Sequence, residues 1–406
     1  MIINKRTFTD YSILTLFIAM SGVPAFKSKL LTVLEFSVLV LIFILRRKSF
    51  DVRFLFFFIL IIGITLLQAL EFQFFSLVTN FGLLIMVLSA YLIVKILDDK
   101  FILYYINILY YIAIVSLVFF IPFTLFPSIA SFFTHSITPL FDRLHSPHDS
   151  FIFYNITYKE GYLKNSGPFW EPGAYTGYLI IAYVFNFFRE SVKMTKKNIV
   201  FLLTIFTTIS TTAYMTIFIF LFLIYYEKFK NIVFKASMTT VVILIGIYAY
   251  NSFDFLGEKI ERQIKFAQTM GIQKSNDTQR FLSILRDMED LKGHELIGRG
   301  GHDKTRYDLA PTDKLLQIRT VGITDVLVRV GIIVFIIMFY FLYRSICIYL
   351  LSMQEKNKIY CIAIFLSIIF TLISETYFLY PMYWSLLFLQ FIYGEKENEK
   401  SRIVYV

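Results

Sequence analysis

The sequence predicts an all-α polytopic membrane protein. Of its 406 residues, 57% are hydrophobic and only 17% are charged, whereas soluble globular domains carry about 25% charged residues. The mean hydropathy is +0.67, and apolar runs long enough to cross a hydrocarbon layer of about 30 Å recur along the chain. We expect a single integral-membrane domain over residues 1–406, with two long polar loops embedded in it.

The first part of the chain contains five apolar runs of roughly membrane-spanning length. They cover residues 11–26, 30–46, 53–70, 74–97 and 101–126. Basic residues gather at Lys5-Arg6 and Arg46-Arg47-Lys48, and short basic links mark the cytoplasmic side of a membrane protein. This orientation places a first outer loop at 127–171, after which a helix starting near Glu171 returns the chain to the cytoplasm.

Residues 198–226 allow either one crossing or two, because the hydroxyl-rich segment 207–212 interrupts the apolar run. A single crossing would place the basic link at 227–235 outside, whereas a hairpin of two short helices keeps it inside, as the distribution of basic residues favours. We therefore expect the hairpin, a crossing over 232–250, a second outer loop over 251–319, and crossings over 321–343, 359–377 and 379–393. The predicted total is about twelve membrane helices, with both chain ends in the cytoplasm.

The second outer loop is predicted to contain an amphipathic helix and a glycine-rich turn. Apolar residues recur at helical spacing from Phe281 to Leu291, with Asp277 or Thr278 as the cap and Gly293 as the stop. The turn Gly298-Arg299-Gly300-Gly301-His302-Asp303 follows, and its glycines would let backbone N–H groups approach an anion.

Arg280 and Arg299 are candidate phosphate ligands in this loop. A guanidinium group binds phosphate oxygens bidentately, so arginine suits a diphosphate at a lipid surface. The alternative is that both arginines form structural ion pairs with nearby acids such as Asp287, Asp290 or Asp303.

The segment from Lys164 to Gly177 joins the first outer loop to the next predicted membrane helix. Pro172 suits the first position of a helix, because its missing N–H has no intrahelical partner there. A helix start carries partial positive charge and free N–H groups, so together with Lys164 it forms a candidate phosphate site. The alternative is an ordinary helix start, at which Glu171 complements the helix dipole and Trp170 anchors the chain at the interface.

Several functional classes find no support in the sequence. The net charge of +10 comes largely from Lys and Arg in short links between apolar runs, so it reports membrane topology and does not indicate nucleic-acid binding. No P-loop and no G-x-S-x-G motif is present, which removes support for nucleotide-driven chemistry and for a serine hydrolase. Potential metal ligands occur in the segment 145–149, but Pro147 breaks the helical spacing that would bring them together. We expect no metal and no cofactor.

The run Lys164-Asn165-Ser166-Gly167-Pro168-Phe169-Trp170-Glu171-Pro172-Gly173-Ala174 resembles the R-x-x-G-x-F-x-E-P-G signature of Wzy-type O-antigen and polysaccharide polymerases. The hydroxyl-rich break at 207–212 is also similar to that family, as is Arg280 followed at a distance by Gly298-Arg299-Gly300. The resemblance covers about residues 160–331. Lys164 departs from the pattern, because it stands where the family usually has arginine.

The resemblance implies a metal-independent glycosyltransferase of the bacterial cytoplasmic membrane. It would polymerise undecaprenyl-diphosphate-linked oligosaccharide repeat units at the outer face of the membrane, with a chain-length regulator protein as a further candidate partner. Lys164, Arg280 and Arg299 would then stabilise the departing diphosphate. Whether the product is O-antigen, capsule or another polysaccharide stays open, as do the sugars and the linkage.

The remaining site residues are a candidate base and candidate sugar contacts. Glu171, His302 and Asp303 are candidates to activate the acceptor hydroxyl, which is a poor nucleophile until a base takes its proton. Trp170 and Tyr175 are candidates to stack on sugar rings, although packing would also explain them.

The sequence is also compatible with two alternative functions. An O-antigen ligase would share the architecture and transfer the glycan to a lipid acceptor. A flippase or other transporter of lipid-linked sugars would concentrate its polar groups near the middle of the bilayer, whereas the charged candidates here lie in the predicted outer loops.

Overall fold

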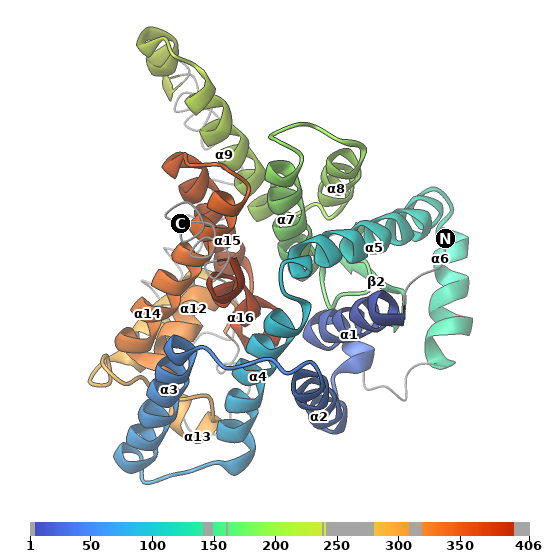
Figure 1. Ribbon diagram of the computed structural model, residues 1–406. Helices are drawn as coiled ribbons and strands as arrows, with labels where there is room; N and C mark the ends of the chain where they lie inside the picture. The colour runs from blue at the N-terminus through green and yellow to red at the C-terminus, as the bar shows by residue number, and fades with distance from the viewer. Residues whose placement is uncertain are drawn as a thin grey trace, which may run out of the picture.

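The computed structural model describes residues 5–140, 149–159, 161–237, 239–240, 280–307 and 319–393. Most of these residues are helical, and the helices pack side by side into one body (Figure 1).

Five long helices open the chain and follow the five predicted apolar runs. They are α1 (Lys5–Gly22), α2 (Lys29–Leu45), α3 (Val52–Glu71), α4 (Leu77–Leu97) and α5 (Lys100–Leu125). Polar residues define where two of them start: the Asp51 side chain accepts a hydrogen bond from the N–H of Arg53, and Ser76 accepts one from Thr79. Such caps satisfy N–H groups that have no partner in the first helical turn.

The second part of the chain contains helices of more varied length. They are α7 (Pro172–Arg189), α8 (Lys196–Thr207), α9 (Thr211–Lys228), α12 (Arg280–Leu291), α13 (Asp303–Arg306), α14 (Gly322–Ser352), α15 (Lys358–Ser374) and α16 (Pro381–Leu387). The predicted break is confirmed as the interruption between α8 and α9, where the Ser210 side chain caps α9. The predicted amphipathic helix is α12, followed by Gly293 with a φ of +79°. Its predicted cap residues, Asp277 and Thr278, lie outside the described residues.

Four of the described helices are long and apolar enough to cross a membrane: α3, α4, α5 and α14. Other described helices are shorter, such as α8 with 12 residues and α16 with 7. The chain is therefore a mostly helical protein with membrane-spanning helices, and the figure of twelve crossings stays a prediction. Residues 241–250 of one predicted crossing lie outside the described residues.

A small antiparallel sheet departs from the all-α prediction. It consists of β1 (Asp149–Phe151), β2 (Tyr154–Lys159) and β3 (Tyr162–Asn165), with Ile156 opposite both Asp149 and Asn165. Aromatic and aliphatic side chains of the sheet pack against the end of α5 and the short helix α6 (Pro127–Phe132). The strands are only three to six residues long, so their alternation of apolar and polar residues is too brief to stand out in a polar loop.

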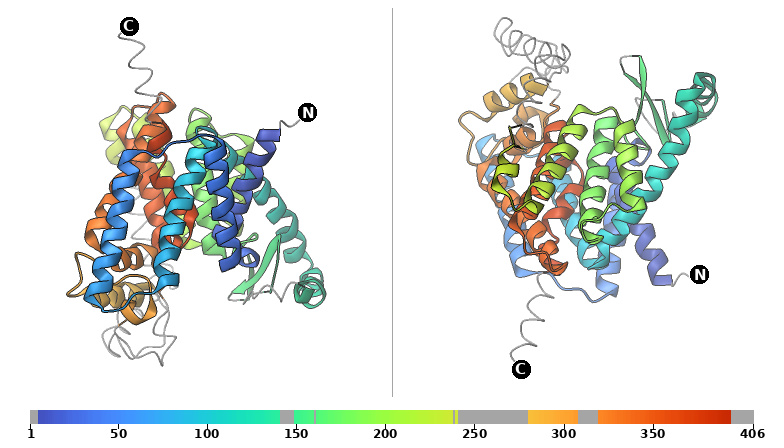
Figure 2. Two further views of the ribbon diagram at one scale, coloured as in Figure 1. Left: turned by 60° about the horizontal axis from the view of Figure 1, so that its bottom comes forward. Right: turned by 90° about the horizontal axis from the view of Figure 1, so that it is seen from above.

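The described parts of both predicted outer loops lie at the same end of the helical body. In the two views of Figure 2, α12, α13 and the sheet lie at one end, and the start of α1 lies at the other. We call the first the outer end. The links between α1 and α2, between α3 and α4 and between α15 and α16 also reach it, because these helices run alternately up and down through the body.

The helix α14 is interrupted at Gly331, whose φ is +73°. The interruption leaves carbonyl groups of the preceding turn without their helical partners. The carbonyls of Val328 and Arg329 accept hydrogen bonds from the N–H groups of Arg299 and Gly300, at 2.7 and 3.0 Å. The glycine-rich turn of the second loop is thereby fixed onto the kink of α14.

Candidate functional site

Glu171 lies at the start of α7, as the sequence predicts. It has extended backbone, with φ −161° and ψ 164°, and Pro172 follows as the first helical residue. The Glu171 side chain makes no capping hydrogen bond to the helix. The carboxylate therefore does not act through a capping hydrogen bond, and the alternative that it complements the helix dipole stays open.

A lysine and two aromatic rings lie beside Glu171. Lys27, in the link between α1 and α2, donates a hydrogen bond of 2.8 Å to the hydroxyl of Tyr380. Its ammonium group lies 4.6 Å from the ring centroid of Trp170 and 4.8 Å from that of Tyr380, a separation at which a cation interacts favourably with an aromatic ring. Trp170, a predicted sugar contact, therefore packs against Tyr380, with the two ring centroids 4.7 Å apart.

Glu375 is a second carboxylate at this place, and it was not among the residues predicted from the sequence. It caps the C-terminal end of α15 and is 8% exposed. A Cβ atom added to Gly173, in the first turn of α7, would lie 2.7 Å from its Oε1 atom. The glycine of the Glu171-Pro172-Gly173 motif therefore allows a carboxylate from another helix to approach the start of α7.

The pKa of the Lys27 ammonium group is affected by its burial and by the two neighbouring carboxylates. Burial lowers the pKa of the Lys27 ammonium below its usual value, and the carboxylates of Glu171 and Glu375 partly oppose that shift. Both carboxylates therefore lie close enough to Lys27 to act on its charge.

Arg280, the first residue of α12, brings a guanidinium group to the same end of α15. Its two amino groups lie 3.3 Å from the hydroxyl of Thr212 and 3.4 Å from that of Ser374, the residue before Glu375. Thr212 belongs to the first turn of α9, so the predicted hydroxyl-rich break also reaches this site. Within the described part of the chain, Arg280 forms no ion pair, and its side chain is exposed.

Two of the three acids named as possible ion-pair partners of Arg280 are engaged elsewhere. Asp287 and Asp290 pair with Arg306, whose side chain is fully buried, and with Arg319. Asp325 of α14 pairs with Arg306 as well, at 3.2 Å. A buried ion pair is costly to break, because one charge is then left without its partner. This network docks α12 onto α14 and so positions Arg280.

The first-loop residues Lys164 and Tyr175 differ in their surroundings. Lys164 is a half-buried residue of β3, in register with Thr157. Tyr175 is fully buried and its hydroxyl lies 3.0 Å from that of Ser116. The Tyr175 ring therefore has no accessible face in this structure, and the prediction that it stacks on a sugar is replaced by a role in packing.

The second-loop candidates form a separate group. Arg299 is 6% exposed and lies over the ring of Phe72. The backbone N–H groups of Arg299 and Gly300 donate hydrogen bonds to carbonyl groups of α14. These two N–H groups are therefore not available to bind the anion that the sequence predicts. The ring of His302 packs at 4.6 Å from that of Phe74.

His302 caps the short helix α13, since its Nδ1 atom accepts a hydrogen bond of 3.2 Å from the N–H of Lys304. Asp303 is exposed in the first turn of that helix. No contact between these two residues and Glu171 is seen among the described residues. One cavity is lined both by Gly301, which precedes His302 in the chain, and by Thr376, which follows Glu375.

Lys27 and Glu375 are the site residues that sequence reasoning missed. The predicted crossing 359–377 contained Glu375, and an ionisable residue inside an apolar span is a candidate functional residue by itself. That signal was available. Nothing local distinguishes Lys27, because its neighbours Trp170 and Tyr380 are far away in the sequence.

Comparisons with known proteins give no independent identification. The chain matches no family model, no curated protein and no solved structure. The resemblance to the polymerase family therefore rests on the short sequence motifs alone.

Proposed function

We propose that the protein is an integral-membrane glycosyltransferase that polymerises undecaprenyl-diphosphate-linked oligosaccharide repeat units. One observation supports the proposal above all: Glu171 and Glu375 gather at the start of α7 with Lys27 and Trp170 beside them, and Arg280 approaches through Ser374. Carboxylates, cations and an aromatic ring at one place supply the groups that glycosyl transfer from a diphosphate requires.

The reaction would form one bond and break another at the anomeric carbon of the donor. The acceptor hydroxyl oxygen bonds to that carbon while the bond from carbon to the diphosphate oxygen breaks, and the hydroxyl proton passes to a carboxylate. Glu171 is the first candidate for this base and Glu375 the second. His302 and Asp303 stay as candidates from the motif resemblance.

Negative charge builds up on the departing diphosphate in the transition state. Preorganised cations help most at that point, because they need no rearrangement as the charge develops. Arg280 is exposed and forms no ion pair among the described residues, so its guanidinium is suited to this role. Lys164 and Arg299 are further candidates from the family pattern.

The proposal includes a membrane arrangement finer than the four long apolar helices. The protein would cross the bacterial cytoplasmic membrane about twelve times, with the outer end facing the periplasm or the cell exterior. Lipid-linked donor and acceptor would then reach the start of α7 from the outer leaflet.

A ligase of the same architecture is the nearest alternative, since it uses the same donor and a different acceptor. A transporter of lipid-linked sugars is the second alternative. The position of Glu171, Glu375 and Arg280 at the end of the helical body favours chemistry at the membrane surface over transport through its middle.

The test is reconstitution of the purified protein with defined lipid-linked repeat units, followed by separation of the products by length. A polymerase gives a ladder of lipid-linked chains that grows with time. A ligase gives transfer only when a second lipid acceptor is added, and a transporter moves the lipid across a vesicle membrane without forming a glycosidic bond. Either of the last two results would replace the proposal.

A further inference from the structure

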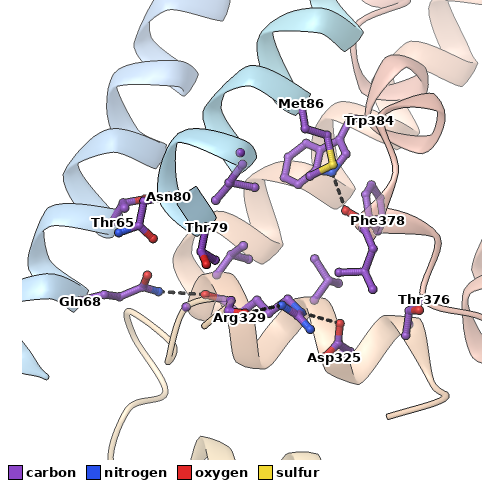
Figure 3. Close-up of a pocket in the computed structure, with 18 residues that line it drawn as sticks. Thr65, Gln68, Thr79, Asn80, Met86, Asp325, Arg329, Thr376, Phe378 and Trp384 are labelled. Carbon is purple, nitrogen blue, oxygen red and sulfur yellow. Dashed lines mark hydrogen bonds and ion pairs between the residues drawn. The ribbon is translucent and has the colours of Figure 1, made fainter. Parts of the chain in front are cut away.

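A cavity of about 220 Å³ lies at the outer end between α3, α4 and the start of α14 (Figure 3). Gln68 and Asn80 line it on the side of α3 and α4, and Asp325 and Arg329 line it on the side of α14. Met86, Phe378 and Trp384 form an apolar wall at its deeper end. None of these side chains belongs to the group around Glu171.

Several polar groups that line the cavity can still donate or accept hydrogen bonds. The Gln68 amide nitrogen donates to the carbonyl oxygens of Ile297 and Arg329, at 2.6 and 2.8 Å, which fixes the orientation of the carboxamide. Within the described ranges, no hydrogen bond engages the Gln68 Oε1 atom, the Asn80 carboxamide or the Thr376 hydroxyl. Polar groups in a pocket are normally satisfied by protein, water or ligand, so these groups are available to a bound molecule.

The charges in the cavity are balanced. The Arg329 Nε atom donates to Asp325 at 2.7 Å and its Nη1 atom donates to the Gly301 carbonyl at 3.2 Å. The other Asp325 oxygen accepts from Arg306. Because the guanidinium charge is already compensated, the cavity offers little attraction for a diphosphate, whereas the mixture of neutral donors and acceptors suits a hydroxyl-rich ligand.

The size and the aromatic wall point to the same class of ligand. A cavity of roughly 150 Å³ accommodates a benzene molecule, so this cavity has room for one six-membered ring with substituents. Trp384 and Phe378 present apolar surface to one side of that space, and the polar groups lie around its edge. A pyranose ring has this pattern, with an apolar face and a rim of hydroxyl groups.

We propose that the cavity between α3, α4 and α14 binds one sugar ring of the lipid-linked substrate, at a subsite separate from the reacting groups at the start of α7. The inference rests on the proposed function for the identity of the substrate. Thr376 lies next to Glu375 in the chain and lines the cavity, so a glycan held there can extend toward the α7 start. The cavity would contribute to the choice of acceptor or donor sugar.

Direct binding of free monosaccharides tests the subsite without any need for catalysis. Saturation-transfer NMR is measured on the purified protein with glucose, galactose, N-acetylglucosamine and rhamnose, one at a time. The variants are Asn80→Leu, which keeps the branched shape of the side chain and removes the amide, and Thr376→Val, which removes one hydroxyl. Thr124→Val is the matched control, since the exposed Thr124 hydroxyl lies on α5 and, among the described residues, donates to the Phe120 carbonyl alone.

We expect at least one of these sugars to bind the wild type, with about three- to tenfold weaker binding for Asn80→Leu and Thr376→Val and no change for Thr124→Val. Absence of binding by the wild type, or binding equal in all four proteins, overturns the subsite. Such a result leaves the proposed function intact if the protein still elongates lipid-linked chains. Conversely, sugar binding that depends on Asn80, in a protein that forms no glycosidic bond, upholds the subsite and removes the polymerase.

Discussion

At the scale of single residues, the group around Glu171 combines residues of one short motif with residues from distant segments of the chain. Glu171 and Trp170 come from the motif, whereas Lys27 and Glu375 come from links between other helices. A motif read along the chain identifies only the residues that are contiguous with it. Groups that converge from distant segments need the fold, or an independent signal such as an acid within an apolar run.

Arg280 provides the first prediction at this scale. We expect Arg280→Ala to lower the elongation rate by about 10²- to 10³-fold, because a preorganised donor to developing negative charge is lost. Arg280→Lys restores little of this loss, since a point charge does not reproduce the planar fork. Elongation is measured with purified lipid-linked repeat units, and Lys292→Ala, an exposed lysine just after α12, is the control. Near-normal elongation by Arg280→Ala would show that Arg280 only links α12 to Thr212 and Ser374.

Lys27 provides the second prediction, which concerns pH. Burial lowers its pKa from the usual lysine value of 10.5, so the ammonium loses its proton at lower pH than an ordinary lysine does. The neutral amine is the reactive form. We therefore expect the labelling of Lys27 by an amine-specific reagent, followed by mass spectrometry of its peptide, to reach half-maximum below pH 10.5. A midpoint at or above that value would mean that the attraction of Glu171 and Glu375 outweighs burial.

At the scale of elements, long apolar helices were predictable and short irregular ones were not. The predicted crossing 101–126 corresponds to α5 (Lys100–Leu125) because a long apolar run leaves little choice of boundaries. The prediction 359–377 extended past Ser374, where α15 ends, and so placed Glu375 inside a span, where an acid is itself a signal of function. The three-stranded sheet was missed altogether, since its pairing partners are set by tertiary contacts with α5 and α6.

The kink in α14 gives a prediction at the element scale. Gly331 has a φ of +73°, and an added Cβ would clash with the Leu296 carbonyl oxygen. With a ψ of 169°, a side chain in that conformation costs about 1–3 kcal/mol before any clash is counted. We expect Gly331→Ala to lower the midpoint of thermal unfolding clearly, whereas Gly63→Ala, in an open position of α3, leaves it unchanged or raises it slightly. Equal midpoints for the two variants would mean that the kink relaxes without cost.

At the scale of the whole molecule, the outer end collects the described parts of both polar loops, the start of α7 and the cavity. Alternation of apolar runs and basic links was enough to predict that the two loops face the same side. It was not enough to predict which loop residues meet. Arg280 reaches the α7 site, whereas Arg299, His302 and Asp303 gather around α3, α13 and α14.

The membrane orientation gives the prediction at this scale. With Cys347 and Cys361 replaced by serine, a cysteine placed at Lys230 should resist a membrane-impermeant thiol reagent in intact cells, and one placed at Lys292 should react. The reason is that Lys230 follows α9 at the end opposite to α12. Reaction at Lys230 from outside would contradict the hairpin formed by α8 and α9 and, with it, the count of twelve crossings.

The central claim is that the start of α7 is the reacting centre, and the rate of elongation by Glu171→Gln tests it most directly. Glu190→Gln, at the opposite end of the same helix, is the matched control. Glutamine keeps the shape and hydrogen-bonding oxygen of glutamate but accepts no proton, and loss of a general base typically costs about 10²- to 10⁴-fold in rate. We predict a loss of at least about a hundredfold for Glu171→Gln, with unchanged thermal stability and a normal rate for Glu190→Gln. Elongation by Glu171→Gln within a few-fold of the wild type would contradict the claim.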